Sequence, residues 1–403
     1  MDKNINDDER ERNITNDDYL NNSISSWEDL DLNSNILRGI YANGFEKPSP
    51  IQAKGIGPML QKKDIIAQAQ SGTGKTGCFC IGCLSLIDFS ENTTQGLILA
   101  PTRELAMQIH EVLSFLSNFI TNIKIQLLIG GTSINTCIDD LLNKIPHIIV
   151  GCPGRVYDMF RRKHLLSENL KCIILDEADE MLSAGFKEQI YNIFQFMPSN
   201  VQVGLFSATL SSELLQITEK FMREPIRILV KQESLTLEGI KQFYIAVDDD
   251  NSKYECIKDL FSSFSISQSI IYCNSTSRVQ ELYDSMNNDN FPVGIIHSNM
   301  EKHERTKNFN DFKSGKNRVL ISSNVTARGI DIQQVSTVIN FDIPKDVATY
   351  LHRIGRSGRW GRKGIGINFV TKRDIRQIKE IEQYYQTEIE EMPINWAESL
   401  ENN

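Results

Sequence analysis

The sequence lacks the features of a membrane or secreted protein. No apolar run approaches the roughly 18 residues that a spanning helix needs, and no hydrophobic signal segment stands near the N-terminus. An excess of positive charge is also missing, because 43 lysines and arginines face 52 aspartates and glutamates, a net charge of −9. We therefore expect no membrane partner and a cytoplasmic location, with the nucleus as an alternative. Nucleic acid is not excluded, because basic residues can gather on one surface.

Cysteine is sparse, with eight residues in 403, which indicates free thiols in a reducing compartment. Cys78, Cys80 and Cys83 lie close together in an apolar stretch and suggest a metal cluster. On a helix, however, spacings of two and three residues do not bring three side chains to one point. We therefore expect these cysteines to be small buried hydrophobic residues.

A phosphate-binding loop is the most informative pattern present. The apolar run Asp64–Ala67 predicts a buried strand, Gly77–Leu84 predicts a packed helix, and a glycine-containing loop ending in Lys75-Thr76 joins them. Glycines let backbone N–H groups surround phosphate oxygens, Lys75 would reach the β- and γ-phosphates, and Thr76 would ligate Mg²⁺. Ala69 stands where the general pattern has its first glycine. The predicted nucleotide contacts here are Ser71, Gly72, Thr73, Gly74, Lys75 and Thr76.

An acidic turn about a hundred residues later supports nucleotide hydrolysis. The apolar run Cys172–Leu175 leads into Asp176-Glu177-Ala178-Asp179. An Asp at the end of a strand can hold Mg²⁺, and Glu177 would orient or deprotonate the attacking water. Such a turn is common by itself, and it indicates nucleotide hydrolysis only in combination with the phosphate loop. The hydroxyls of Ser207 and Thr209, after another apolar run, are expected to hydrogen-bond Asp179.

The chain alternates apolar strands with helices, which predicts parallel sheets. Each strand ends in a Gly-, Pro-, Thr- or Arg-containing turn, and ligands bind at the carboxyl ends of strands in such sheets. The turns together suggest a groove suited to a phosphodiester chain. The predicted strands are Asp64–Ala67, Gly96–Ala100, Ile125–Ile129, His147–Gly151, Cys172–Leu175, Val201–Phe206, Lys241–Val247, Ser269–Tyr272, Pro292–Ile296, Arg318–Ser322, Val335–Phe341 and Ile365–Val370.

Phe45 and Gln52 lie upstream of the phosphate loop, in and beyond a turn with two prolines. An aromatic ring can stack on a base, and a Gln carboxamide can pair with the N6 and N7 edge of adenine. A Pro-rich turn that only caps a helix is the alternative.

Arginine clusters occur twice. We expect Arg161-Arg162-Lys163 to be a solvated face. Arg353, Arg356 and Arg359 recur every three residues and would share one helix face. Like charges at this spacing repel each other, so a solvated face is again possible, but a γ-phosphate held by the other half of the chain would compensate them.

With these motifs in order, the chain resembles the DEAD-box RNA helicases of superfamily 2 from about Trp27 to Asn395, and it looks most like their translation-initiation (factor four-A) and exon-junction branches. The resemblance implies an α/β fold of two tandem RecA-like domains, each a parallel sheet flanked by helices. It implies ATP and Mg²⁺ as cofactors, single-stranded RNA or mRNA as partner, a protein scaffold and a monomeric chain. The expected organisation is a disordered Asn- and Asp-rich tail (1–25), an ATP-binding domain (26–231), a linker (232–238) and a second domain (239–403).

The resemblance also implies roles for individual residues. The catalytic set is Lys75, Glu177 and two arginine fingers, Arg356 and Arg359, and Asp331 approaches the ribose. The implied RNA contacts are Pro101, Thr102, Arg103, Gly131, Gly154, Arg155, Arg305, Ser323 and Arg328. The residues implied to couple the domains are Asp179, Ser207, Thr209, His352 and Arg353. Four departures from the family pattern, Cys152, Lys302, Asn324 and Trp360, affect expected RNA contacts and not the catalytic set.

Three hypotheses about function follow. The first is an RNA-dependent ATPase that unwinds RNA locally, in translation initiation. The second is an ATP-dependent RNA clamp of an exon-junction-type complex, or a nuclear RNA-processing helicase. The third, a phosphate-loop protein unrelated to nucleic acid, leaves the backbone-binding turns without a role. The complete catalytic set favours an enzyme.

Overall fold

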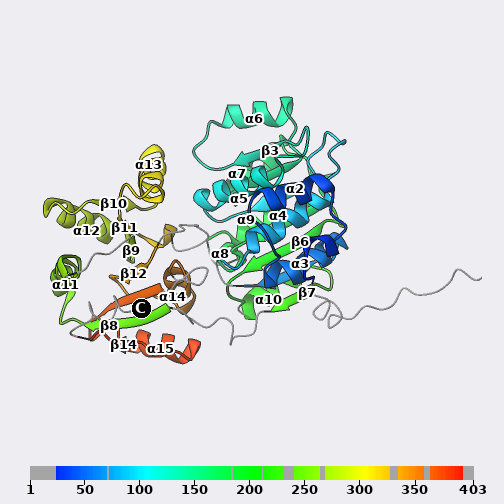
Figure 1. The fold of residues 1–403 in the computed structure, drawn as a ribbon. Coiled ribbons are helices and arrows are strands. Elements are labelled where there is room, and N and C mark those ends of the chain that lie inside the picture. Colours follow the sequence, from blue (N-terminus) through cyan, green and yellow to red (C-terminus); the bar gives the residue numbers. More distant parts are fainter. Residues whose placement is uncertain are drawn as a thin grey trace, which may run out of the picture.

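The computed structural model describes residues 24–69, 72–182, 185–210, 212–229, 240–263, 268–326, 335–357 and 364–393. These residues form two seven-stranded sheets, and every strand pair in them is parallel (Figure 1). Helices flank both sheets, so the predicted α/β fold with two similar domains is confirmed. The predicted tail (mostly residues 1–23) and the linker lie outside the described residues. Ile24, which we placed in the tail, already donates a backbone hydrogen bond to the carbonyl of Ala53.

The first sheet has the strand order β3-β4-β2-β5-β6-β1-β7. Its central strands are buried along almost their whole length because helices cover both faces, which explains their continuous apolar sequences. The strands are β1 (Ile65–Gln68), β2 (Gly96–Leu99), β3 (Ile125–Leu128), β4 (Ile148–Gly151), β5 (Cys172–Asp176), β6 (Gln202–Ser207) and β7 (Ile226–Leu229). The helices are α2 (Ser34–Ala42), α3 (Pro50–Leu60), α4 (Lys75–Leu86), α5 (Arg103–Leu116), α6 (Ile134–Asn143), α7 (Pro153–Arg161), α8 (Ala178–Met181), α9 (Lys187–Phe194) and α10 (Ser212–Thr218), with a 3₁₀ turn, η1 (Trp27–Asp29).

The second sheet has the order β10-β11-β9-β12-β13-β8-β14. Its strands are β8 (Ile240–Ala246), β9 (Ser269–Tyr272), β10 (Val293–Ile296), β11 (Val319–Ser322), β12 (Thr337–Asn340), β13 (Gly364–Val370) and β14 (Glu390–Glu391). Its helices are α11 (Asp250–Ser263), α12 (Thr276–Asn288), α13 (Lys302–Lys313), α14 (Val347–Ile354) and α15 (Ile375–Tyr385), with a 3₁₀ turn, η3 (Asn324–Thr326).

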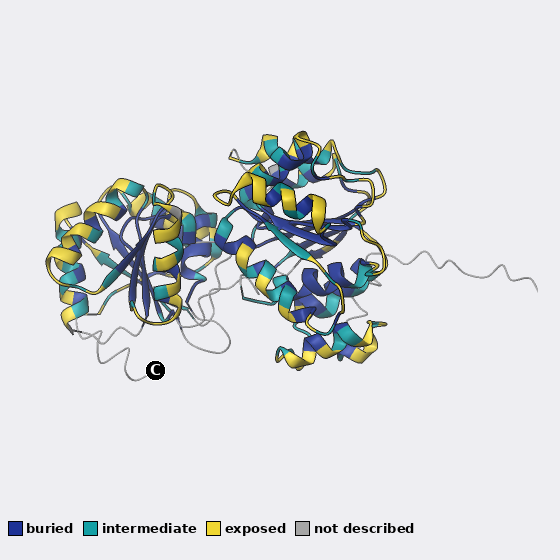
Figure 2. Cartoon of the chain, turned by 90° about the horizontal axis from the view of Figure 1, so that it is seen from above, coloured by how far each residue is buried: buried dark blue, intermediate teal, exposed yellow. Residues whose placement is uncertain are grey.

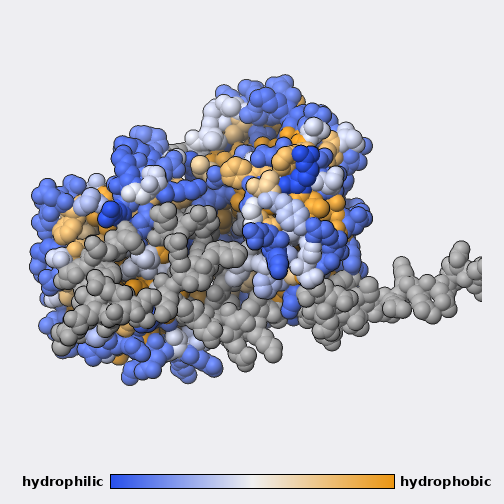
Figure 3. Space-filling view, viewed as in Figure 1, coloured by the Kyte–Doolittle hydropathy of each residue, from blue (hydrophilic) through white to orange (hydrophobic). Residues whose placement is uncertain are grey.

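Each sheet separates two hydrophobic clusters, one under the helices of each face. Figure 2 shows the buried strands at the centre of both domains and the exposed residues on the outer helices. Trp27 is fully buried in one of the clusters, as its large apolar side chain predicts. The face in Figure 3 is largely hydrophilic where it is described, with hydrophobic residues mainly over the first domain. Among the described helices, none has the length and apolar character needed to cross a membrane.

All twelve predicted strands are present, but the sequence analysis missed β7 and β14. The short strand β7 pairs with β1 at the edge of the first sheet and contains Arg227, so it has no continuous apolar run. Strand β14 consists of two exposed glutamates that pair with β8. Neither strand has an apolar pattern that predicts it.

Candidate nucleotide- and RNA-binding site

The phosphate loop joins β1 to α4 as predicted. Gly72 and Gly74 have φ angles of +84° and +102°, in the left-handed region that favours glycine. A Cβ atom at Gly74 would lie 2.6 Å from Ser49 Oγ, so no larger residue fits there. Lys75 is the first residue of α4 and is buried, and its Nζ has no hydrogen-bond partner within the described part of the chain. Gly72, Thr73, Gly74 and Thr76 belong to this described loop and helix start, whereas Ser71 lies outside the described residues.

Gln52 and Phe45 lie directly beside the phosphate loop. The Oε1 atom of Gln52 accepts a hydrogen bond from the backbone N–H of Ser49 (2.8 Å), and its Nε2 donates to the carbonyl of Gly74 (3.1 Å). A Cβ atom at Gly77 would lie 3.1 Å from the Phe45 ring, so the ring closely approaches the first turn of α4. Gln52 also caps α3, as in the alternative interpretation of this stretch. One carboxamide thus links the start of α3 to the phosphate loop.

Asp176 and Glu177 are buried at the carboxyl end of β5. The Lys75 Nζ and Glu177 Oε1 atoms are 4.0 Å apart. Burial and the neighbouring Glu177 raise the pKa of Asp176 to about 7. Two adjacent buried carboxylates beside an ammonium group form an anionic donor set that a divalent cation would stabilise. Glu177 has a φ of +52°, a conformation that non-glycine residues rarely adopt and that occurs at functional sites.

Asp179 connects the two domains. Its Oδ2 atom accepts a hydrogen bond from Thr209 Oγ1 (2.8 Å), and it lies 3.0 Å from Nε2 of His352 in the second domain. Ser207 Oγ instead donates to the backbone carbonyl of Thr209 (2.7 Å). The expected contact of Asp179 with Thr209 is therefore present, whereas the expected contact of Asp179 with Ser207 is wrong, because the Ser207 hydroxyl bonds the Thr209 backbone.

Arg353 and Arg356 do not lie on one helix, so the expected shared helix face is wrong for these two arginines. Helix α14 ends at Ile354, between Arg353 and Arg356. Arg356 is buried and its Nε donates to the carbonyl of His352 (3.1 Å). Arg359 and Asp331 lie outside the described residues.

Arg353 is fully buried within the second domain. It donates to Asn274 Oδ1 (2.7 Å), to Asn324 Oδ1 (2.7 and 2.9 Å), to Asn340 Oδ1 (3.1 Å) and to the carbonyl of Asp342 (2.7 Å). Burial lowers its pKa to about 10. Arg353 therefore ties the wall residues Asn274 and Asn324 to the helix that carries His352.

A groove of about 1070 Å³ separates the two domains on the side of the predicted RNA contacts. Of those contacts, it is lined by Pro101, Thr102, Arg103, Gly154, Arg155, Arg305 and Ser323. Gly130 lines it, but its predicted neighbour Gly131 does not, and Arg328 lies outside the described residues. Two guanidiniums among these predicted contacts have protein partners: Arg155 donates to Oγ1 and to the carbonyl of Thr132 (both 3.0 Å), and Arg305 donates to Glu104 Oε2 (2.6 Å).

Several residues of the groove wall were given no RNA-binding role in the sequence analysis. They are Tyr157, Asp158, Arg161, Glu180, Phe186, Gln189, Asn274, Ser275, Thr276, Ser298 and Val325. Arg161, expected on a solvated face, pairs with Asp158 and also lines the groove. Asn274, Ser275 and Ser298 closely follow predicted strands, whereas Tyr157, Phe186 and Gln189 belong to α7 and the start of α9 and have no strand end as a signal. Glu104, the domain-bridging partner of Arg305, directly follows the predicted contact Arg103 but was given no role.

Two of the four residues that depart from the family pattern lie in the wall of the groove. Cys152 replaces the threonine of the family pattern, and burial raises the pKa of its thiol to about 12. Asn324 lines the groove and accepts the two hydrogen bonds of Arg353 described above. Nothing is described for Trp360 or for the side chain of Lys302.

Comparison with known proteins agrees with this site. The family model of the DEAD/DEAH box helicases matches residues 49–217, and that of the helicase conserved C-terminal domain matches residues 252–361. The ATP-dependent RNA helicase eIF4A of Debaryomyces hansenii is 50% identical over 372 residues, 92% of this chain and 93% of that protein. Eukaryotic initiation factor 4A of Caenorhabditis elegans is 52% identical over 379 residues, 94% of this chain and 93% of that protein.

Solved structures show the same two-domain arrangement. Saccharomyces cerevisiae Dbp5 bound to RNA and ADP BeF3 superposes with a TM-score of 0.87 at 34% identity, over 94% of this chain and 98% of that chain. A Dbp5 variant bound to Nup159, a Gle1 variant, IP6 and ADP gives 0.63 at the same identity, over 92% and 98%. The present structure therefore superposes more closely on the RNA- and ADP BeF3-bound Dbp5 than on the Dbp5 variant of that complex.

Proposed function

Because the chain belongs to the DEAD/DEAH box helicase family, and is an ATP-dependent RNA helicase like the eIF4A proteins it matches, we propose that it binds ATP in the first domain, binds single-stranded RNA in the interdomain groove, and couples the two through the contacts between its domains. The observation that carries this proposal is the assembly of both halves of the site across one cleft: His352 of the second domain contacts Asp179, three residues after the buried Asp176.

The phosphate end of the nucleotide fits the described residues. Lys75 Nζ is a buried ammonium that has no hydrogen-bond partner among the residues described, at the place where the loop would surround an anion. Asp176 and Thr76 would hold Mg²⁺, which neutralises charge on the phosphates when it is bound. Burial and the adjacent Glu177 raise the pKa of Asp176 to about 7, and a cation held beside it would favour its ionised form. Gln52 would hydrogen-bond the edge of the adenine. Its hydrogen bond to the Gly74 carbonyl would link adenine binding to the phosphate loop.

Glu177 is the proposed group that orients the attacking water. It follows Asp176 directly, and its backbone conformation directs its side chain toward Lys75, 4.0 Å away. A carboxylate in this place accepts a proton from water aimed at the γ-phosphate. Arg356 is the proposed arginine finger, since α14 and the turn after it bring it to the interdomain side beside His352.

The groove would hold the RNA backbone. Its wall combines helix N-termini at α5 and α7 with guanidiniums, and both kinds of group bind phosphates. The Nε atoms of Arg103 and Arg305 are buried and have no hydrogen-bond partner among the described residues. These donors support a polyanion as the occupant.

We further propose that the protein acts as a monomer in translation initiation in the cytoplasm, together with a scaffold protein. The similarity to relatives named eIF4A supports this role. The test is ATP-dependent separation of a short RNA duplex by the purified chain. Unwinding should require ATP and should be absent with a DNA duplex of the same sequence. A chain that hydrolyses ATP at the same rate with and without RNA would contradict the proposal.

A further inference from the structure

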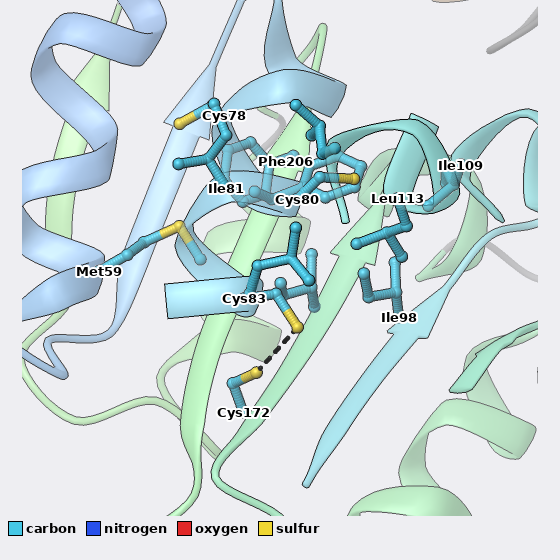
Figure 4. Packing of buried hydrophobic residues seen from close by; sticks show 14 of the residues in the cluster. Met59, Cys78, Cys80, Ile81, Cys83, Ile98, Ile109, Leu113, Cys172 and Phe206 are labelled. Atoms are coloured by element: carbon cyan, nitrogen blue, oxygen red, sulfur yellow. Dashed lines mark hydrogen bonds between the residues drawn. The ribbon is translucent and has the colours of Figure 1, made fainter. Parts of the chain in front are cut away.

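The cysteines of α4 are core residues, but one of them has a close thiol partner. Cys78, Cys80 and Cys83 are each fully buried. The Sγ atom of Cys83 lies 3.6 Å from the Sγ atom of Cys172, the first residue of β5 (Figure 4). The two residues are 89 positions apart in the sequence. Figure 4 shows both sulfur atoms in the layer between helix and sheet, directed toward each other.

A glycine makes room for this pair. Gly96 on β2 is the cross-strand neighbour of Cys172. A Cβ atom at Gly96 would lie 2.8 Å from Cys83 Sγ, so any side chain there would push the sulfur away. Ile87 and Ile148 also pack against Gly96, so the surrounding core is tightly packed. The fold thus holds two thiols from distant parts of the chain in one small space.

We propose that Cys83 and Cys172 form an intramolecular disulfide when the protein meets a peroxide, and that this bond fixes α4 to β5. A disulfide has an S–S length of about 2.05 Å, so the sulfurs would have to approach by roughly 1.5 Å. We expect rotation of the two side chains to supply this displacement.

The chemistry balances with peroxide as the two-electron oxidant. One thiol attacks the O–O bond of hydrogen peroxide, which gives a sulfenic acid and one water. The second thiol then displaces the sulfenic oxygen, which leaves as a second water while the S–S bond forms. Both sulfurs are oxidised, and the peroxide oxygens are reduced. A thiol reductant reverses the bond by thiol–disulfide exchange.

The bond would form far from the nucleotide. Cys83 lies in the last turns of α4, whereas Lys75 begins this helix, and Cys172 begins β5, whereas Asp176 ends it. Given the rise per residue of helices and strands, Cys83 is roughly 12 Å from Lys75 along α4, and Cys172 is about as far from Asp176 along β5. We therefore expect the disulfide to leave ATP turnover unchanged. Because it closes a long loop in the unfolded chain, it should raise the unfolding midpoint of the first domain.

Reaction is expected to be slow. The hydrogen bond with Cys172 and burial raise the pKa of the Cys83 thiol well above its usual range, so little thiolate is present. The partly exposed Cys256 should therefore react earlier. Only mapping of the oxidised residues distinguishes the proposed bond from such side reactions.

The test is treatment of the full chain with hydrogen peroxide, followed by alkylation of free thiols and peptide mapping without reductant. The expected product is a peptide pair joined through Cys83 and Cys172, with the unfolding midpoint raised by several degrees and lowered again by a reductant. Cys83→Ala and Cys172→Ala should each lose both effects, whereas Cys78→Ala, another buried thiol of α4, should keep them. The mapping in the unaltered chain does not depend on the folding of any variant. Recovery of both residues as free thiols after Cys256 is oxidised, or an unchanged midpoint despite the bond, would overturn the proposal.

Discussion

Glu104 of the first domain and Arg305 of the second form an ion pair of 2.6 Å across the interdomain groove, with 7% and 13% of their side chains exposed. Arg305 also lines the groove, so its place in the wall depends on the position of the other domain. RNA binding and domain closure are thereby linked at one guanidinium. A second pair on the same two helices, Glu111 and Lys313 at 3.5 Å, is about half exposed.

Glu104→Gln should weaken the RNA complex that forms with a non-hydrolysable ATP analogue. Loss of one member of a buried charge pair costs about 2–5 kcal/mol, which corresponds to at least a 30-fold loss of affinity. Glu111→Gln is the matched control, because an exposed pair contributes about 0–1 kcal/mol. Equal losses in the two variants, measured by fluorescence anisotropy, would show that closure does not pass through Glu104.

Glu177→Gln should separate nucleotide binding from hydrolysis. The amide cannot accept a proton from water, and general base catalysis contributes about 10²–10⁴-fold in rate. ATP affinity should remain, because Lys75 and the loop glycines are unaltered, and the RNA complex should become long-lived. Single-turnover hydrolysis and RNA dissociation are the measurements. Turnover like that of the unaltered chain would exclude the assigned role.

Gln52→Ala should reduce the preference for ATP over GTP. The carboxamide touches both Ser49 and Gly74, so its removal also loosens the phosphate loop. The expected loss of ATP affinity is about 1–3 kcal/mol, with GTP affinity changed less. If Gln52 only caps α3, both nucleotides should lose affinity to the same extent, and competition binding with the two nucleotides decides between these outcomes.

Asn324→Asp should stabilise the second domain. Among the described residues, the hydrogen-bond acceptors around the buried Arg353 are neutral oxygens. A carboxylate at position 324 would make charge-assisted bonds, which are stronger than neutral ones. We expect a gain of about 1 kcal/mol in the free energy of unfolding. Asn324→Ala should instead destabilise the protein, because two donors of Arg353 would lose their acceptor. Denaturant unfolding of both variants tests this, and a lower stability of Asn324→Asp would contradict it.

The sequence was sufficient for twelve of the fourteen described strands and for the position of the phosphate loop between β1 and α4, because both depend on local patterns. The loop that ends in Lys75-Thr76 and the turn Asp176-Glu177 each follow an apolar strand, and parallel pairing brings the carboxyl ends of such strands together. Contacts between the domains could not be predicted in this way. The interdomain partner of Arg305 and the partners of Arg353 within the second domain both depend on tertiary geometry. The three-residue spacing of the arginines suggested a shared helix face, but α14 ends at Ile354, between Arg353 and Arg356.

The central claim is that the two domains form one ATPase site. It is tested most directly by the ATPase rate of the full chain across a titration with single-stranded RNA, for the unaltered protein and for Arg356→Ala. An arginine finger contributes on the order of 10³–10⁵-fold where it has been measured in GTPases. We predict a low rate without RNA, saturable stimulation in the unaltered protein, and no stimulation of Arg356→Ala even at saturating RNA, although ATP still binds. A variant that reaches the maximal rate of the unaltered chain at high RNA concentration would contradict the account.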